Sequence, residues 1–342
     1  MTVLNVLWFF LIFVLILGYF VLDGFDLGAG VLSPFIAKDE REKAMVRAAV
    51  GPVWDGNEVW LLTAGGALFA AFPFAYATTF SGFYLAVMLV LFGLILRAVA
   101  VEYAGRDRDW AGIWNVLFFV GSLLPALLLG VAVGCIFQGI PMDADGNYNG
   151  IPLLGLLSPF TLCCGLFGLC LMLLQGAGWL AYKVPAGTGL YERAANLRRP
   201  LAIASLVLFV VLTVFVAGRM LEMDPTLSLV RYLVAALFCV CIVASAYFMG
   251  RGQGSELKAF LLTSASLALI IVLLACSMFP NLVVASPDSI GPTLTLMNAC
   301  ATDTSLFYMT IIACIGVPLV LFYHFLVYRT FRGKIRESDL EY

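Results

Sequence analysis

Long apolar runs alternate with short polar segments along almost the whole chain. A helix needs about 20 mostly apolar residues to cross a bilayer, and about nine segments reach that length. They lie near residues 4–33, 57–77, 79–102, 112–138, 153–182, 200–218, 227–249, 257–280 and 305–328. The pattern therefore predicts an all-α, polytopic transmembrane helix bundle, in which a short turn from Pro73 to Thr79 separates the second and third helices.

The predicted helices divide into two four-helix units plus one further helix. The first unit covers approximately residues 1–138, and the remaining five helices lie in residues 153–342. A Gly-rich stretch at 23–30 is faintly echoed at 175–178, so a parallel duplication of four-helix units is conceivable. Because no low-complexity tract or large soluble segment interrupts the chain, we expect residues 1–342 to form a single integral membrane domain.

The composition agrees with a membrane protein. Of the 342 residues, 63% are hydrophobic and 12% are charged, whereas a soluble domain carries about 25% charged residues. A net charge of −2 without any basic stretch gives no support for nucleic-acid binding. The nine cysteines form no CxxC pair, which favours packed or lipid-facing thiols over a disulfide framework.

The distribution of basic residues predicts the orientation. Of the 19 Lys and Arg, only Arg219 and Arg231 fall on one side of the nine predicted helices. The others lie in segments 38–47, 97–108, 183–199, 251–258 and 329–336. Cytoplasmic loops carry the excess of basic residues, so we expect the N-terminus outside and the C-terminus in the cytoplasm. An eight-helix arrangement would scatter these segments over both sides.

The first polar cluster is DGFDLGAG, residues 23–30. The apolar run from Leu4 to Ala37 would be about 50 Å long as a helix, against a hydrocarbon core of about 30 Å, so this helix must tilt, bend or protrude. An Asp at a membrane depth costs roughly 2.5–3.5 kcal/mol on insertion scales. The i,i+3 spacing places Asp23 and Asp26 on one helix face. They either hydrogen-bond neighbouring helices and fix packing, or lie near a proton or ligand path.

The second polar cluster is WDGNEVW, residues 54–60, at the predicted cytoplasmic end of the second helix. Asp55, Asn57 and Glu58 lie between Trp54 and Trp60, which we interpret as interface anchors. Carboxylates in a first helical turn are favoured by the helix dipole, so capping is one explanation. The alternative is that these two carboxylates, with the amide beside them at the membrane edge, take up and release protons.

Arg97 and His324 are the remaining polar residues of interest. Arg97 could extend to the membrane interface or pair with one of the carboxylates. His324 is the single histidine, and it lies near the inner end of the last predicted helix. No zinc-protease, nucleophile-elbow, Walker or dinucleotide-binding motif is present, which leaves soluble-enzyme chemistry unsupported.

At its two polar clusters the sequence resembles subunit II of the cytochrome bd-type quinol oxidases. The resemblance rests on GYFVLDGFDLGAGVL (18–32), WDGNEVWLLTAGGALFAAFP (54–73) and YATTFSGFYLAVMLVLFGLILR (76–97). A weaker match runs from MFPN (278–281) to FRGKI (331–335). The count of nine helices agrees with the architecture of that family.

The resemblance implies a place in a bacterial respiratory enzyme of the cytoplasmic (inner) membrane. Such a complex oxidises quinol and reduces O2 to water, and it takes protons from the cytoplasm. Two b-type haems and haem d are expected on the partner, subunit I, together with the quinol-oxidising loop, and none on this chain, which fits its single histidine. This chain is expected to stabilise subunit I within the lipid. A structural quinone or lipid and a small accessory subunit are possible further partners.

The resemblance also implies roles for the residues of both clusters. Asp55 matches a carboxylate at the cytoplasmic mouth of a proton path, and Asn57 and Glu58 match the polar positions beside it. Asp23 and Asp26 match paired aspartates that make polar contacts close to that path. From the resemblance we also expect three residues to fix helix packing: Trp54, Trp60 and Arg97.

Two other functional classes remain as alternatives. A secondary transporter also has intramembrane carboxylates and Gly-interrupted helices, but the chain shows no inverted repeat and no matching pair of broken helices. An intramembrane transferase would need a carboxylate cluster in a cytoplasmic loop. Loop 38–53 instead interleaves its acids with bases, which indicates a solvated surface.

Overall fold

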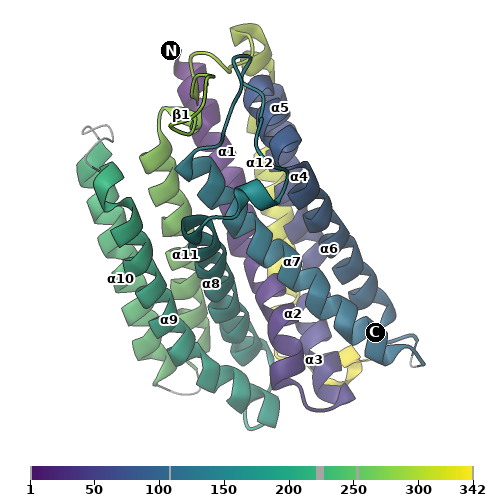
Figure 1. The fold of residues 1–342 in the computed structure, drawn as a ribbon. Helices are drawn as coiled ribbons and strands as arrows, with labels where there is room; N and C mark the ends of the chain where they lie inside the picture. The colour runs from purple at the N-terminus through teal and green to yellow at the C-terminus, as the bar shows by residue number, and fades with distance from the viewer. Residues whose placement is uncertain (1, 108, 221–226, 252–253, 341–342) are drawn as a thin grey trace.

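Most of the long helices run roughly parallel along the long axis of the molecule, and the N- and C-termini lie at opposite ends (Figure 1). The structure is a computed structural model that describes residues 2–107, 109–220, 227–251 and 254–340. Its helices are α1 (Val3–Leu22), α2 (Gly24–Ile36), α3 (Glu40–Val50), α4 (Trp54–Ala71), α5 (Pro73–Gly82), α6 (Tyr84–Tyr103), α7 (Ala111–Gln138), α8 (Pro159–Lys183), α9 (Gly189–Met220), α10 (Ser228–Met249), α11 (Glu256–Met278) and α12 (Asp303–Thr330).

The all-α membrane bundle predicted from the sequence is confirmed. In the described part of the chain, eight helices are long and apolar enough to cross a bilayer, with α1 and α2 counted as one. α4 has 18 residues but is not among them, because polar residues fill its first turn. The count of nine spans and the orientation therefore stay predictions. The termini lie at opposite ends of the molecule, which favours an odd number of spans.

Several predicted boundaries are wrong. The turn expected from Pro73 to Thr79 is the helix α5, since Phe72 leaves helical geometry and Pro73 takes the first helical position, which proline favours. The span predicted from residue 79 therefore begins only at Tyr84. Loop 38–53 contains the helix α3, in which Arg47 is buried.

The long first span is divided into α1 and α2 at Asp23. Asp23 ends α1 and precedes α2, and its backbone N–H still donates to the Tyr19 carbonyl at 2.8 Å. The two helices together extend from Val3 to Ile36. The first polar cluster begins at the junction of the two helices.

The two Gly-rich stretches meet where α2 crosses α8. A Cβ on Gly28 would lie 1.9 Å from the Met172 carbonyl oxygen, and a Cβ on Gly176 would lie 2.4 Å from the Ala29 nitrogen. Only glycine permits such an approach of two backbones. The segments whose similarity was noted in the sequence are thus packing partners, while the duplication of four-helix units stays a prediction.

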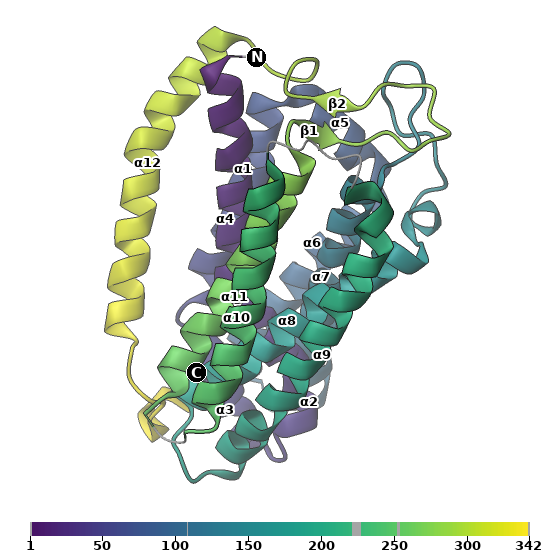
Figure 2. The same cartoon turned by 90° about the vertical axis from the view of Figure 1, so that its left-hand side faces the viewer.

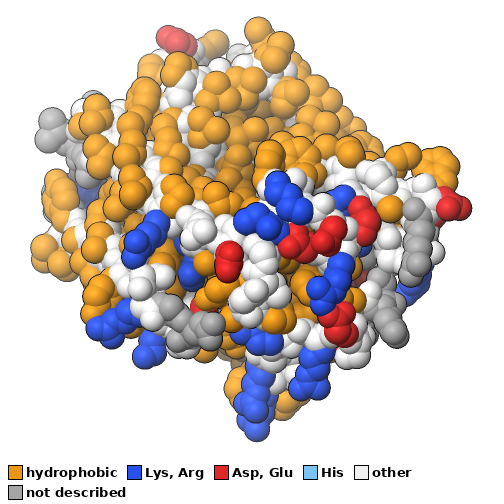
Figure 3. All heavy atoms as spheres, turned by 90° about the horizontal axis from the view of Figure 1, so that it is seen from below, with side chains coloured by type: hydrophobic (Ala, Val, Ile, Leu, Met, Phe, Trp, Pro, Cys, Tyr) orange, Lys and Arg blue, Asp and Glu red, His pale blue; other side chains and the backbone are white. Residues whose placement is uncertain are grey.

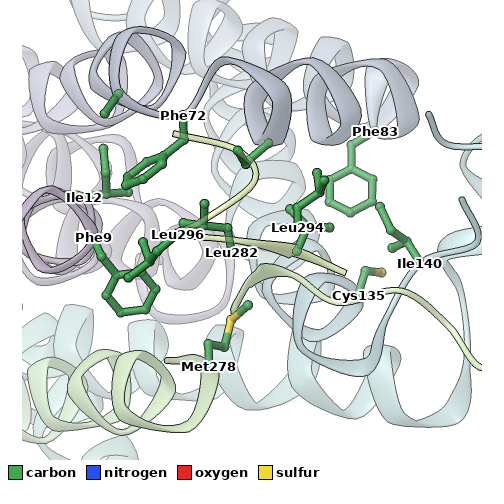
Figure 4. Close-up of a cluster of buried hydrophobic side chains, with 14 of the residues drawn as sticks. Phe9, Ile12, Phe72, Phe83, Cys135, Ile140, Met278, Leu282, Leu294 and Leu296 are labelled. Carbon is green, nitrogen blue, oxygen red and sulfur yellow. The ribbon is translucent and has the colours of Figure 1, made fainter. Parts of the chain in front are cut away.

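A two-stranded sheet covers the end of the bundle that carries the N-terminus. β1 (Asn281–Val283) pairs antiparallel with β2 (Leu294–Thr295), in the segment between α11 and α12. Figure 4 shows Leu282, Leu294 and Leu296 pointing among side chains of the neighbouring helices, including Phe72 and Phe83. This hydrophobic cluster fixes the outer loops on the bundle.

α12 stands apart from the other helices along one side of the molecule (Figure 2). Leu306 and His324 are its buried residues. Near its start, Trp8 Nε1 donates to the Leu306 carbonyl at 3.2 Å. After its end, the Lys334 ammonium donates to the carbonyls of Ala181 and Val184 at the C-terminus of α8, at 3.1 and 3.0 Å. The helix is therefore held mainly at its two ends.

Lys and Arg side chains gather on the end of the molecule that carries α3 and the C-terminus (Figure 3). This is the end at which the basic segments were expected together. Arg108 and the side chain of Arg219 lie outside the described residues. Arg231, on the opposite side of the predicted membrane, is buried.

Candidate functional site

Arg97 is the centre of a buried polar cluster formed by α1, α4 and α6. Its side chain is 1% exposed, and its Nη2 donates to Asp23 Oδ1 at 2.7 Å. The same nitrogen donates to Glu58 Oε1. Arg97 therefore pairs with a carboxylate from each polar cluster, and the alternative in which it extends to the interface is wrong.

Asn57 forms the second half of the cluster. Its Nδ2 donates to Asp26 Oδ2 at 2.7 Å and to the Leu22 carbonyl at 3.0 Å. Its Oδ1 accepts a hydrogen bond from the Tyr328 hydroxyl at 3.0 Å. Asn57 is fully buried, and it bridges the junction of α1 and α2 to the last turns of α12.

Trp60 lies inside the bundle rather than at the membrane interface. Its Nε1 donates to His324 Nε2 at 3.1 Å, and its ring occupies the space beside Gly18, where a Cβ would lie 2.1 Å from the indole. The interpretation of Trp60 as an interface anchor is therefore wrong. Trp54, by contrast, is half-buried against hydrophobic residues around α3 and α8.

The exposure of the acidic residues decreases along α4 toward Arg97. Asp55, in the first turn of α4, is exposed, and its carboxylate forms no hydrogen bond or ion pair with another residue of the described chain. The Glu58 side chain, one turn further, is 23% exposed, while that of Asp23 is 0% exposed. The structure thus brings Asn57, Glu58, Asp23 and Asp26 together and leaves Asp55 at the surface beside them.

Capping explains neither carboxylate of α4 fully. The N-cap of α4 is Val53, which supplies no side-chain hydrogen bond. Glu58 is engaged by Arg97 rather than by backbone N–H groups. A favourable interaction with the helix dipole remains open for Asp55.

The sequence did not indicate Tyr328 or Tyr19 as members of the cluster. Tyr19 lies one helical turn before Asp23 and is fully buried, so its i,i+4 spacing could have been noticed. Tyr328 comes from α12, and its contact with Asn57 spans 271 positions of the chain. No local pattern predicts such a contact.

His324 makes a hydrogen bond through each of its ring nitrogens. Its Nε2 accepts from Trp60 at 3.1 Å, and its Nδ1 lies 2.9 Å from the Val320 carbonyl. That pairing requires the proton on Nδ1, so both ring nitrogens of the neutral imidazole are engaged. In the described residues, no group of three or more His, Cys, Asp or Glu could hold a metal ion.

The comparison with known proteins covers nearly the whole chain. The model of the family "Cytochrome bd terminal oxidase subunit II" matches residues 4–331. This chain belongs to that family. It is 34% identical to the cytochrome bd ubiquinol oxidase subunit 2 of Bacillus subtilis (strain 168), with 99% of each chain covered. It is 32% identical to the cytochrome bd-I ubiquinol oxidase subunit 2 of Escherichia coli (strain K12), over 99% of this chain and 97% of the relative.

The fold agrees with this membership. The bd oxidase structure from Geobacillus thermodenitrificans superposes with a TM-score of 0.75 at 17% identity, over 96% of this chain and 99% of that chain. As subunit II of a cytochrome bd-type oxidase, the chain is part of a quinol-oxidising, O2-reducing complex in the bacterial inner membrane. The transporter alternative is not favoured.

Proposed function

We propose that subunit II supplies protons to the oxygen-reducing site of the complex through the carboxylates around Arg97. The single observation that supports this most is the stepwise burial from exposed Asp55, through half-buried Glu58, to fully buried Asp23. A purely structural ion pair needs no such graded opening to the surface. Asp55 would be the entry, Glu58 the first relay, and Asp23 and Asp26 the inner groups.

Arg97 cannot release its proton, so its part in the relay is to hold carboxylates in place. Five buried polar atoms of the cluster have no hydrogen-bond partner among the described residues: Tyr19 OH, Asp23 Oδ2, Asp26 Oδ1, Arg97 Nε and Arg97 Nη1. Buried polar atoms are nearly always hydrogen-bonded, and water is the usual partner where protein is not. We expect water molecules to join these atoms into a continuous hydrogen-bonded chain.

The haems are proposed to reside on subunit I, because the one histidine of this chain already uses both ring nitrogens. The surface formed by α4 and α12 would face that subunit. The Glu58 side chain on α4 is 23% exposed, and α12 carries a row of exposed large hydrophobic side chains. A broad apolar contact there would exclude lipid from the opening of the cluster.

Neutral replacements of the acids on α4 test the relay. With Glu58→Gln, quinol-driven O2 consumption should fall by about a hundredfold or more, the lower end of the range for loss of a positioned proton-transfer group. Asp23 still pairs with Arg97, so the haem content should be unchanged. Asp55→Asn should slow turnover as well. The measurements are O2 uptake and proton uptake by the purified complex in liposomes.

The matched control is Glu102→Gln, which removes an exposed acid at the same end of α6. This variant should turn over like the parent complex. Wild-type O2 and proton uptake in Glu58→Gln would contradict the proposed function. If only Asp55→Asn consumed O2 at the normal rate, Asp55 would not be part of the relay. Its role would then be a favourable interaction with the dipole of α4.

An apolar cavity fits the structural quinone or lipid expected for the complex. It has a volume of about 350 Å³ and lies between α7, α8, α9, α10 and α11, lined among others by Phe167, Phe209 and Leu274. Thr213→Trp should fill it and lower the amount of quinone or phospholipid that is extracted from the purified complex. Val214→Trp, on the neighbouring exposed position, should not. Equal extracts from both variants would remove the cavity as a binding site.

A further inference from the structure

We propose that Tyr328 is a positioning residue for Asp26, acting through the side-chain amide of Asn57. This inference rests on the proposed function, because it assigns Asp26 a working role in proton supply. It adds a residue of the last helix to the site. The observation that carries it is the continuous chain of hydrogen bonds from the Tyr328 hydroxyl through Asn57 to the Asp26 carboxylate.

The orientation of the Asn57 amide follows from its neighbours. Its Nδ2 faces the Leu22 carbonyl and the Asp26 carboxylate at 3.0 and 2.7 Å. A carbonyl can only accept, so the reversed amide would set two acceptors against each other. The NH2 group must therefore point inward, and Oδ1 must point to Tyr328, which donates at 3.0 Å.

Tyr328 supplies the hydrogen bond that completes this arrangement. With the hydroxyl in place, both hydrogens and the oxygen of the buried Asn57 amide are used. Without the hydroxyl, Oδ1 is a buried acceptor that has lost its partner. This unsatisfied acceptor destabilises the present orientation of the amide and favours its rotation away from Asp26. The ring of Tyr328 is held in turn by stacking on His324, with centroids 6.4 Å apart.

Tyr328 and Glu58 belong to two different hydrogen-bonded routes into the cluster, which we call branches. Glu58 and Arg97 lead to Asp23, whereas Tyr328 and Asn57 lead to Asp26 from the half-buried side of α12. The charged and titratable groups around the amide are thus Asp26, Asp23, Glu58 and Arg97. Tyr328 is the member of the cluster that comes from the helix standing apart from the bundle.

The test is Tyr328→Phe in the assembled oxidase, with Tyr323→Phe as the matched control. Both changes remove one phenolic oxygen from α12, but the Tyr323 hydroxyl has no hydrogen bond within the described chain. Tyr328→Phe should slow quinol-driven O2 consumption about three- to tenfold, the rate equivalent of one hydrogen bond. Haem content and thermal stability of the complex should match those of the control.

Infrared difference spectra give a readout that a merely structural role would not change. The carboxyl band that disappears in Asp26→Asn should move to higher wavenumber in Tyr328→Phe, because that carboxyl loses the donation of a fixed amide. Adding Tyr328→Phe to Asp26→Asn should cause no further slowing. This result would place both residues in one branch.

Two results would overturn the inference. The first is an Asp26 carboxyl band that does not shift in Tyr328→Phe, together with O2 consumption equal to that of Tyr323→Phe. This would show that the hydroxyl does not position the amide. A full additional slowing in the double variant would show that Tyr328 acts elsewhere. The proposed function would survive both results, because it is tested by the effects of Glu58→Gln and Asp55→Asn.

Discussion

Arg97→Met should prevent the oxidase from accumulating with its haems. The substitution keeps a flexible, unbranched side chain but leaves Asp23 and Glu58 without their shared cation. Removing one partner of a buried ion pair costs about 3–5 kcal/mol, because the remaining charge is buried and uncompensated. Here a single cation serves two carboxylates, one of them fully buried, so we expect the upper part of that range.

The measurements are haem d absorbance per milligram of membrane protein and the thermal unfolding of whatever complex can be purified. Arg329→Met, which removes an exposed arginine at the end of α12, is the matched control and should assemble normally. Adding Asp23→Asn and Glu58→Gln to Arg97→Met should restore haem content but not O2 consumption. Normal haem content in Arg97→Met alone would mean that the buried pairs contribute little to assembly.

Gly176→Ala should destabilise subunit II by about 3 kcal/mol or more, at the upper end for overpacking a closely packed contact. The added Cβ would lie 2.4 Å from the backbone nitrogen of Ala29, and backbone cannot rotate away as a side chain can. α2 and α8 would have to separate. Because α2 begins directly after Asp23, that movement should also disturb the cluster around Arg97.

Gly168→Ala provides the comparison on the same helix, since its Cβ would meet the Gly130 Cα at an ordinary 3.6 Å. Thermal unfolding and the yield of assembled complex should therefore fall for Gly176→Ala and stay unchanged for Gly168→Ala. If the two alanine variants behaved alike, the crossing of α2 and α8 would tolerate more separation than its geometry suggests.

Hydrophobic run lengths alone predicted the all-α bundle and most of its helices. They failed at Pro73, where the preference of proline for a first helical position produced α5 instead of a turn. They predicted a span over 57–77, whereas α4 is not among the described helices that are apolar enough to cross a bilayer, because Asp55, Asn57 and Glu58 lower its apolar character. The residues of the candidate site thus make the helix that carries them less typical of a membrane span.

The residues of the site were predicted better than their connections. Both polar clusters were identified because acidic residues at membrane depth are costly. Whether Arg97 pairs or extends outward could not be decided, since the choice depends on how α6 packs against α1 and α4. Tyr328 was missed for the same reason, as its contact with Asn57 exists only in three dimensions.

The late position of α12 in the chain has a consequence for biogenesis. The ribosome synthesises α12 after every other transmembrane helix. The partners that arrive last are Tyr328, His324 and Lys334, whose ammonium holds the C-terminus of α8. A nascent subunit therefore holds Asn57 and Trp60 without these partners until its final helix enters the bilayer. A chain that ended before α12 would leave the Asn57 amide oxygen and the Trp60 indole N–H without these hydrogen-bond partners.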